Sequence, residues 1–450
     1  MPRSLVFKVL ILMGVTFLLL LVLLRIGWVV DERQAYQREA VDSVGQSQAG
    51  AQTLLGPLLL RNCTELWTVT TGEGKDRQTA TQSSDSFLVA TPAQLDVSGA
   101  LNQEARYRGL FKVNGYGGKI SLKANWPDLA TLQPKPTHEG GRMQCAAPRL
   151  MLADNDVRGL RGAHLTVDKI DVPVRPGTTH PDYANGLHAE LPMAAAAQSL
   201  QIQLDVDLAG TQSFAFVPAS AATQVHLRSD WPHPSFAGRF LPTSRVVNEQ
   251  GFDAQWQVSE LGSSAARDVL NRKIVPGVGG LVPGQVDTLE FALIDPINPY
   301  VMSDRAIKYG LLFITLTFVC VGLIELLGGA RVHPVQYLLV GLAQALFFLL
   351  LLSVSEHLDF GIAYAIAAAA VVGLLTHYGS AVLGGMRRGA LFGAGIALLY
   401  GVLYVLLTLE QAALLVGSAL LFGLLAAVMM ATRRLNWYAL GNKDDSSQQL

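Results

Sequence analysis

Two patterns of hydrophobic and polar positions divide the chain. Residues 9–24 read VLILMGVTFLLLLVLL, and five later runs also have the length of about 20 apolar residues that a membrane-spanning helix needs. These five runs cover roughly residues 309–327, 335–354, 360–378, 390–409 and 412–431. Between the first run and the others, apolar and polar residues alternate in short stretches. The pattern predicts an α-helical membrane bundle of six spans, one N-terminal anchor plus five C-terminal helices, with a large soluble insert.

The first apolar run follows Arg3 and Lys8, an order of charges that a secretory signal peptide shares. A signal peptide has a shorter apolar core and ends at a small-residue cleavage site, whereas this run continues through RIGWVV into DERQAYQREA. We therefore interpret it as an uncleaved anchor rather than as a cleaved signal. The polar, Ala- and Gln-rich stretch of about 31–55 then predicts a membrane-proximal helix that is ended by the Gly56-Pro57 pair.

The insert carries runs such as LQIQLDVDLAGTQSFAFV and FDAQWQVSE, in which apolar residues recur at every second position. Such runs, broken by Gly, Pro and Asn, predict a mainly antiparallel β domain, either a sandwich or a barrel. KVNGYGG predicts a hairpin turn, because Asn-Gly accepts the positive φ of a type I′ turn. ISLKANWPD (120–128) is echoed by VHLRSDWPH (225–233), with Trp126 and Trp231 in equivalent places. The echo favours two related β units.

One segment of the insert, SDWPHPSFAGRFLPTSR (229–245), has the aromatic, proline, histidine and arginine content of a binding or catalytic loop. Its conspicuous residues are Trp231, Pro232, His233, Pro234, Phe236 and Phe240. Proline has no backbone N–H and ends strand pairing, so Trp231 is expected to be a core anchor at a strand end. A catalytic His233 would need a nucleophile or an orienting acid, and no triad pattern accompanies it. We interpret the segment as a structural joint whose two phenylalanines fill gaps between elements.

The charges between the apolar runs indicate the orientation of the helices. Basic residues occupy alternate connectors and the C-terminal exit: Arg331, Arg387, Arg388, Arg433, Arg434 and Lys443. The other connectors carry the acids Glu356, Asp359 and Glu410. The positive-inside rule then places both termini in the cytoplasm. The predicted parts are a cytoplasmic start and anchor (1–30), an external β-rich domain (31–304), a five-helix bundle (305–432) and a cytoplasmic tail (433–450).

Composition agrees with a membrane protein and excludes one class of partner. Half of the 450 residues are hydrophobic, 15% are charged, and the net charge is −1. Because no basic stripe is present, the chain is predicted to bind no nucleic acid. Cys63 and Cys145 fall in the external part, where they either form a disulfide or stay two free buried thiols. Cys320 is expected to pack as a small hydrophobic residue.

Candidate metal ligands lie in one loop of the insert. His180, Asp182 and His188 fall within nine residues of a Pro/Gly-rich stretch, but their spacing is not that of a metal site. DNDVRG (154–159) begins like a calcium loop and lacks its later acceptors and closing Glu. We predict no catalytic residue, no metal and no cofactor.

Ionisable residues inside a membrane span would mark a transport path or a proton relay. Glu325 and His377 lie near the cytoplasmic ends of their runs, and only the uncharged Gln344 and Thr315 lie near the middle. The tripeptide SEH (355–357) lies at an outer end, where it either caps a helix against the external domain or forms a plain polar loop. This distribution counts against a proton-coupled transporter.

Three long blocks resemble the CreD family of bacterial inner-membrane proteins: SDWPHPSFAGRFLPTSRVVNEQGFDAQWQVSELG, DRAIKYGLLFITLTF and HPVQYLLVGLAQALFFLLLLSVSEHLDFGIAYAIA. Besides the joint, the family motif covers Asp304, Arg305, Lys308, Tyr309, His333, Pro334, Glu356 and His357. The second span departs from the family pattern, since CVGLIE stands where FFLFE is expected and only Glu325 keeps its place. The resemblance implies a multi-pass inner-membrane protein with a periplasmic domain, associated with the CreBC two-component regulon and with envelope integrity.

Three functional hypotheses remain. The first is a non-enzymatic envelope protein whose periplasmic β domain binds a protein or lipid partner. The alternative is a transporter or permease-like component with a periplasmic receptor domain, and the missing midplane charges count against it. The third, a periplasmic hydrolase, has no nucleophile–base arrangement behind it.

Overall fold

The computed structural model describes residues 3–71, 78–193, 195, 199–271, 286–295, 298–328, 332–409 and 413–433. The chain forms two compact units. The membrane unit consists of Met1–Gln37 and Ile297–Leu450, and the sheet unit of Arg38–Pro296. Of the residues whose charges indicated an orientation, Arg331, Glu410, Arg434 and Lys443 lie outside the described part.

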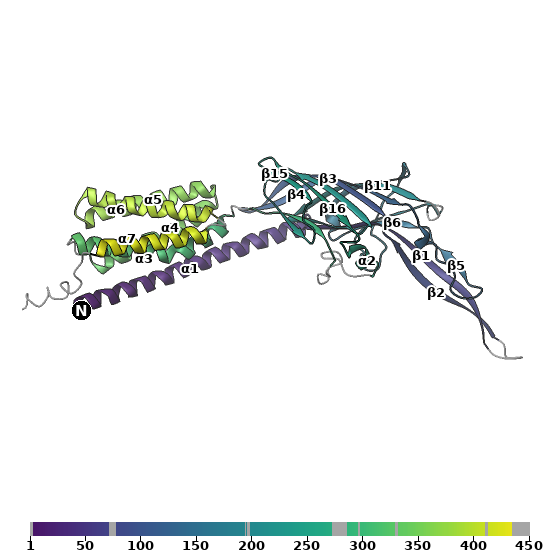
Figure 1. Cartoon of the computed structure of the whole chain (residues 1–450), viewed down its shortest axis with the longest axis horizontal. Coiled ribbons are helices and arrows are strands. Elements are labelled where there is room, and N and C mark those ends of the chain that lie inside the picture. The colour runs from purple at the N-terminus through teal and green to yellow at the C-terminus, as the bar shows by residue number, and fades with distance from the viewer. Residues whose placement is uncertain are drawn as a thin grey trace, which may run out of the picture. The chain divides into compact units, whose positions relative to one another are not determined.

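Long apolar helices build the membrane unit (Figure 1). They are α1 (Arg3–Ser47), α3 (Pro299–Gly328), α4 (Pro334–Ser355), α5 (Phe360–Val382), α6 (Met386–Thr408) and α7 (Ala413–Thr432). Within the described residues, the first five are long and apolar enough to cross a membrane. The 20-residue α7 covers the sixth predicted run. One anchor plus a C-terminal bundle is therefore the architecture that the apolar runs predicted.

The start of the chain differs from the prediction in one respect. The anchor and the membrane-proximal helix are a single helix, α1, which ends at Ser47 instead of reaching Gly56-Pro57. That pair lies inside strand β1 (Gln52–Thr71). The pairing of β1 with the neighbouring strand β6 (Arg149–Asp154) shifts register there, between Leu55 and Leu58. Gly56 has φ +114°, and a Cβ there would come within 3.0 Å of the Met151 carbonyl oxygen. The glycine allows an irregularity in a strand. From the sequence alone, this use of Gly-Pro cannot be distinguished from the end of a helix.

Two sheets make up most of the sheet unit. Sheet A has the order β14-β17-β12-β1-β6-β10-β9, and β2 and β5 also pair with β1. Its remaining strands are β2 (Gln78–Ala90), β5 (Arg142–Cys145), β6 (Arg149–Asp154), β9 (Arg175–Pro176), β10 (Gly186–Glu190), β12 (Ser213–Val217), β14 (Pro234–Gly238) and β17 (Leu289–Leu293). The short helix α2 (Ala265–Leu270) belongs to the same unit.

Sheet B has the order β15-β16-β13-β3-β4-β11-β7-β8. Its strands are β3 (Gln94–Arg108), β4 (Phe111–Trp126), β7 (Leu160–Val167), β8 (Ile170–Val172), β11 (Leu200–Thr211), β13 (Ala222–Ser229), β15 (Ser244–Asn248) and β16 (Gly251–Ser259). Among the described strands only β1–β12 and β3–β13 pair in parallel. The domain is thus mainly antiparallel, as the alternating runs predicted.

A shared apolar core lies between the inward faces of the two sheets, as period-two alternation requires. Trp126 at the end of β4 is 1% exposed, and Trp231 just past β13 is 5% exposed. The two echoed segments are therefore strand ends with buried indoles. They belong to the same sheet, one on each side of β3, so the echo does not correspond to the division into sheets.

Three smaller predictions are corrected or decided by the fold. The predicted turn at NGYGG is wrong: these residues run through the middle of β4, and the turn before it contains Gly109, with φ +59°. At Gly118 a Cβ would lie 2.0 Å from the Ala100 carbonyl oxygen, so close strand approach explains the glycine. Cys63 and Cys145 form a disulfide between β1 and β5. Cys320 is exposed on α3 instead of packed.

Candidate functional site

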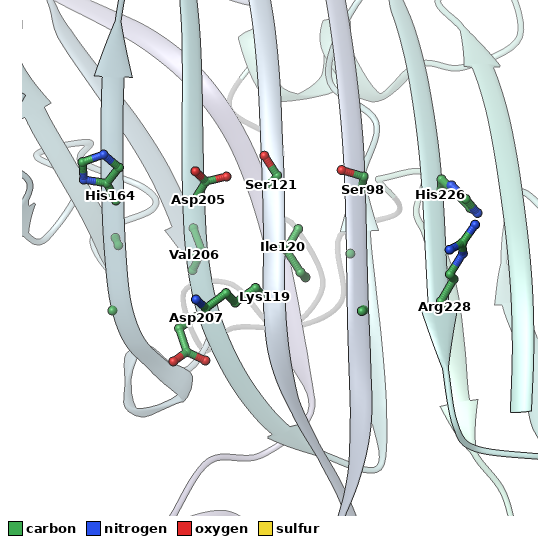
Figure 2. Close-up of a pocket in the computed structure, with 14 residues that line it drawn as sticks. Ser98, Lys119, Ile120, Ser121, His164, Asp205, Val206, Asp207, His226 and Arg228 are labelled. Atoms are coloured by element: carbon green, nitrogen blue, oxygen red, sulfur yellow. The ribbon is translucent and has the colours of Figure 1, made fainter. Parts of the chain in front are cut away.

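The outward face of sheet B is hollowed into a cavity of about 770 Å³, which we call the trough. Five neighbouring strands line it: β13, β3, β4, β11 and β7. Their inward residues are apolar and buried, so period-two alternation turns the polar residues outward, as in LQIQLDVDLAG of β11. Figure 2 shows these polar side chains side by side on neighbouring strands.

Strand register arranges the trough residues in two rows. The first row is His226, Ser98, Ser121, Asp205 and His164, each directly opposite the next. The second row is Arg228, Ala100, Lys119, Asp207 and Gly162. Neighbouring strands lie about 4.8 Å apart, so each row spans about 19 Å. The five strands lie between residues 94 and 229 of the sequence.

Both rows of the trough combine small and larger side chains. Ser98, Ala100, Ser121 and Gly162 are the small ones and form its floor, while histidines stand at the two ends of the first row. The Ser121 hydroxyl is buried and has no hydrogen-bond partner within the described structure. The floor therefore offers hydroxyl groups to a ligand without side chains that would fill the space.

Charged pairs fix the ends of the trough. His226 Nε2 lies 2.9 Å from Asp253 Oδ1, and the Arg228 Nε–H donates to Asp253 Oδ2 at 2.7 Å. Partial burial raises the pKa of the Asp253 carboxyl, but the hydrogen bonds from His226 and Arg228 outweigh it and hold the pKa below its ordinary value. At the other end, His164 Nε2 lies 3.3 Å from Asp171 Oδ1. Both signs of charge thus line one surface.

Ser98, His226 and Asp253 lie on three successive strands in the order of a hydrolase triad. No hydrogen bond joins Ser98 to His226 in the described structure, and strand β3 pairs on both sides, with β4 and β13. Its backbone N–H groups are therefore used in the ladders and cannot serve as oxyanion donors beside Ser98. The arrangement suits binding better than acyl transfer.

The segment 229–245 lies apart from the trough floor and connects the two sheets. It leaves sheet B after β13, pairs with sheet A as β14, and returns to sheet B as β15. The Trp231 Nε1–H donates to the His233 carbonyl oxygen at 2.8 Å, and the His233 side chain is exposed. The Phe236 ring packs edge-on against Phe252, at 5.5 Å between centroids. The Phe240 carbonyl accepts a hydrogen bond from Trp256.

The other motif residues lie at helix ends of the membrane unit. Lys308 and Asp304 form an ion pair at 2.7 Å one turn apart on α3, which also carries Arg305 and the half-buried Tyr309. His333 caps the N-terminus of α4: its Nδ1 accepts from the Val335 N–H at 3.3 Å, and Pro334 is the first helical residue. His333 and Pro334 thus mark a helix boundary, whereas the motif residues of α3 lie within the helix.

Two polar clusters join α1 to α3 and α4. In the first, Lys8 contacts Glu325, whose other oxygen accepts from the Tyr337 hydroxyl at 3.1 Å. In the second, Glu356 caps the C-terminus of α4, accepts from the Tyr300 hydroxyl at 3.3 Å and lies 3.5 Å from Arg33 Nε. His357 Nδ1 lies 3.2 Å from the Ser353 carbonyl oxygen. Glu356 is thus the C-cap of α4, while contact of SEH with the external domain stays a prediction.

The loop residues considered as metal ligands are structural. His180 is 3% exposed, its Nδ1 accepts from the Asp182 N–H at 3.1 Å, and His188 Nδ1 lies 2.5 Å from the Gly177 carbonyl oxygen. In the described part of the chain, no group of three His, Cys, Asp or Glu side chains could hold a metal ion. DNDVRG instead holds the connection from α1 to β1, since Asp156 accepts from the Gly50 N–H at 3.0 Å.

Sequence reasoning did not find the trough. The sequence did contain a sign of it. The polar residues of alternating runs such as LDVDL and VHLRS indicate the outward face of a sheet. What joins them is the pairing of strands that begin near residues 94, 111, 160, 200 and 222, and pairing order cannot be read from alternation.

Comparisons with known proteins agree over nearly the whole chain. A family model described as "Inner membrane protein CreD" matches residues 4–438. The curated Inner membrane protein CreD of Escherichia coli (strain K12) is 33% identical over 444 residues, which cover 98% of this chain and 95% of that protein.

Solved structures show much weaker likeness. An M1 zinc metallopeptidase from Deinococcus radiodurans is 11% identical, covering 45% of this chain and 41% of its own, with a TM-score of 0.21. Native yeast LTA4 hydrolase is 8% identical, covering 50% and 34%, with a TM-score of 0.22. Scores this low carry no inference about this chain.

Proposed function

The chain belongs to the CreD family of inner membrane proteins, and from that premise we propose that it is a non-enzymatic envelope protein whose sheet unit lies in the periplasm and binds a polar partner in the trough. The membrane unit anchors and orients this receptor. The proposal retains the association with envelope integrity and assigns the binding step to named residues. The single observation that carries it is the trough itself.

The chemistry of the trough indicates the kind of partner. Lys119 and Arg228 offer positive charge, Asp205 and Asp207 negative charge, and Ser98 and Ser121 neutral hydroxyls. Small-molecule pockets are mostly enclosing, with few polar groups, whereas this surface is open and carries charges of both signs over about 19 Å. An acyl chain would bury these charges without partners at high cost. A polar protein surface is therefore favoured over a lipid.

Transport finds less support in the membrane unit. Among its described residues, Gln344 and Thr317 form a buried polar pair, in which the Gln344 side-chain amide donates to the Thr317 hydroxyl at 2.7 Å. The expected Thr315 is exposed and donates to a carbonyl oxygen of its own helix. A small cavity beside Tyr337 is lined mostly by Val, Leu and Phe. Neither feature is the chain of charged groups that a proton-coupled path requires.

Site-specific photo-crosslinking in cells tests the proposal. A photoreactive residue at Ser98 or Ser121 should yield one discrete adduct, because both positions face the floor of the trough. The matched control is Leu261, which is 96% exposed in a turn of the same unit. The double change Lys119→Gln and Asp207→Asn should reduce the adduct about tenfold, the equivalent of about 1.4 kcal/mol of binding.

Two outcomes would contradict the proposal. One is an equal adduct from Leu261, which would mean that the trough is not the contact surface. The other is an undiminished adduct from the double variant, which would mean that its charges do not recognise the partner.

A further inference from the structure

A projecting ribbon of two strands, which we call the arm, consists of residues 64–71 of β1 and 78–85 of β2 (Figure 1). The two strands pair in antiparallel register from Leu59↔Ala90 to Thr71↔Gln78. On its other side β1 pairs with β5 only as far as Leu66↔Arg142. Beyond that point the described arm has two strands, and an isolated two-stranded ribbon is marginally stable in water.

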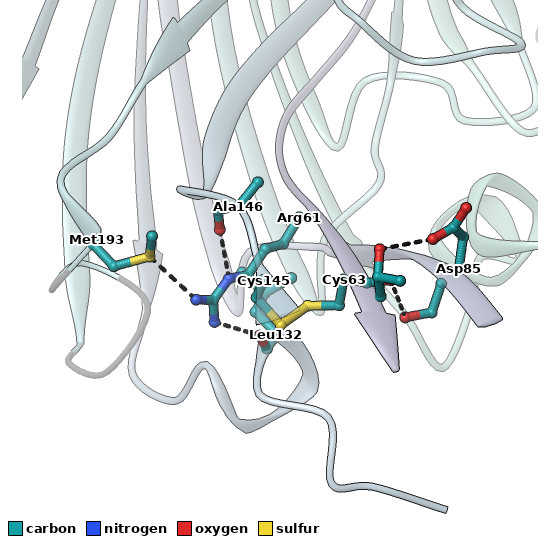
Figure 3. Close-up of a disulfide and its surroundings, with 9 residues drawn as sticks. Arg61, Cys63, Asp85, Leu132, Cys145, Ala146 and Met193 are labelled. Carbon is teal, nitrogen blue, oxygen red and sulfur yellow. Dashed lines mark hydrogen bonds between the residues drawn. A yellow bond between two sulfur atoms is a disulfide. The ribbon is translucent and has the colours of Figure 1, made fainter. Parts of the chain in front are cut away.

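Several interactions hold the base of the arm. The Cys63–Cys145 disulfide joins it to β5, and Arg61 beside it donates to the carbonyl oxygens of Ala146 and Leu132 at 2.9 and 2.8 Å (Figure 3). Glu65 accepts from the N–H groups of Thr137 and His138, both at 2.7 Å. These contacts hold the base of the arm on the β1 side, where the Trp67 ring also stacks on His138 at 3.7 Å between centroids, whereas residues 78–85 of β2 are exposed.

The outer edge of β2 is open and unprotected. In the described part of sheet A, β2 pairs with β1 alone, and residues 78–85 are all exposed. Proteins protect such edges with charges, proline, bulges or short strands. The run QTATQSS (78–84) has no charge, no proline and no glycine. The Asp85 carboxylate that follows accepts a hydrogen bond from the Thr64 hydroxyl at 2.7 Å.

One edge of sheet B, strand β15, differs in these respects. Strand β15 has five residues, and it carries Arg245, whose guanidinium lies 5.6 Å from the centre of the Phe236 ring. It is short and charged, as a protected edge is. Strand β2 has 13 residues. Unlike β15, β2 combines length with a run, residues 78–84, that has none of these protecting features.

We propose that β2 pairs with β2 of a second copy of this chain, antiparallel and centred on Thr81. In this register Thr81 lies opposite Thr81, Thr79 opposite Ser83, and Gln78 opposite Ser84. Hydroxyl pairs of this kind stabilise adjacent strands, and the uncharged run places no like charges opposite each other. The contact is the same patch on both copies, which a two-fold dimer requires.

Threonines on β1 lie beside those on β2 and would extend the row of hydroxyl side chains. Within one chain Thr68 lies opposite Thr81 and Thr70 opposite Thr79, so these threonines share one face of the arm. Pairing of two copies would make a row of four threonines across β1, β2 and their counterparts. The resulting four-stranded sheet has the three or more strands that independent stability needs. A self-pairing edge therefore completes the arm.

Cysteine crosslinking of the full-length protein in membranes tests the register, in a Cys320→Ser background that removes the exposed thiol. Thr81→Cys should give a disulfide-linked dimer, because directly opposite Cβ atoms lie about 5 Å apart. Thr79→Cys and Ser83→Cys should crosslink only when co-expressed. Thr68→Cys, three strand spacings or about 14 Å from its counterpart, should not crosslink.

Light scattering of the purified full-length protein in detergent supplies the second measurement. The unmodified chain should be a dimer, Thr81→Lys should be a monomer, and the matched Thr68→Lys should stay a dimer. A monomeric unmodified chain would overturn the proposal. So would a dimer that Thr81→Lys leaves intact, or a Thr81→Cys thiol that bonds a different protein.

Discussion

Asp154, at the end of β6, is a carboxyl group with no exposed surface. Burial raises its pKa to about 7, although the Asp156 N–H, 3.4 Å from Oδ1, acts to lower it. The other oxygen, Oδ2, has no hydrogen bond in the described structure. Its neighbours Asn155 and Asp156 accept from or donate to the backbone of the connection from α1 to β1. Ionisation of Asp154 should therefore destabilise this connection.

The raised pKa predicts how stability depends on pH. The folded state keeps the Asp154 proton up to about pH 7, whereas the unfolded chain loses it near pH 4. Stability should therefore fall as pH rises from about 4 to 7 and level off above 7. The difference of about 3 pH units corresponds to about 4 kcal/mol, or on the order of 10 °C in the unfolding midpoint of the sheet unit.

Tryptophan fluorescence of the full-length protein, heated at pH 5 to 8, measures this effect because Trp126, Trp231 and Trp256 are buried in the sheet unit. Asp154→Asn keeps the shape and removes the titration, so its midpoint should change little with pH. If the variant lost stability with rising pH as steeply as the unmodified protein, the dependence would come from another group.

Glu65 shows the opposite environment at the base of the arm. The Thr137 hydroxyl and the backbone N–H of His138 donate to its carboxylate and lower its pKa to about 2. Its anchoring bonds are therefore present above the ordinary pKa of a glutamate and are lost only as pH falls toward 2. The arm and the junction at Asp154 thus respond to different ranges of pH.

At the scale of elements, the segment 229–245 carries the connection between the sheets. Trp231→Ala should cost about 3–5 kcal/mol, because the indole is 5% exposed and its N–H closes the turn at His233. That is a large share of the roughly 5–15 kcal/mol that holds a domain folded, so folded yield should drop. Phe240→Ala should lower the folded yield less than Trp231→Ala, because the Phe240 ring is half-buried.

The matched change in the same segment is His233→Gln. The histidine contributes its carbonyl oxygen, while its side chain is exposed, so folded yield and any envelope phenotype should stay nearly intact. Loss of the phenotype from an abundant, correctly inserted His233→Gln protein would assign the residue to a site and end its interpretation as part of a joint.

Sequence patterns predicted these elements to different extents. The alternation in LQIQLDVDLAG identifies β11 because each apolar position is buried, and Trp-Pro identifies a strand end. NGYGG and Gly56-Pro57 misled for one physical reason: glycine permits a turn and a close approach of two backbones equally well. Only the neighbouring strand decides between these uses, and the neighbour is a tertiary property.

At the scale of the molecule, the distance along α1 between the two polar clusters can be compared with the thickness of a bilayer. Lys8 and Arg33 are about 25 residues apart on α1, or about 37 Å at 1.5 Å per residue. The hydrocarbon core of a bilayer is about 30 Å thick, so the clusters of Glu325 and Glu356 fall at opposite headgroup levels. Glu325 and Glu356 thus have charged partners on α1. The apolar runs of the sequence could not reveal these pairs.

The orientation of the helices is the last prediction. With Lys8 and Glu325 on the cytoplasmic side and Arg33 and Glu356 on the periplasmic side, the loop after α4 faces the periplasm and the loop between α5 and α6 faces the cytoplasm. The basic Arg387 and Arg388 beside the second loop agree with this assignment. In this orientation both termini are expected in the cytoplasm.

A membrane-impermeant maleimide checks the orientation in spheroplasts of the Cys320→Ser variant. Leu358→Cys, after α4, should be labelled at once, because Leu358 is 45% exposed and its loop faces outward. Met386→Cys, at the start of α6, is 75% exposed but should react only after permeabilisation. Both positions are accessible in the fold, so access through the membrane is the remaining difference. Immediate labelling of Met386→Cys would reverse the assigned topology and place the trough on the cytoplasmic side.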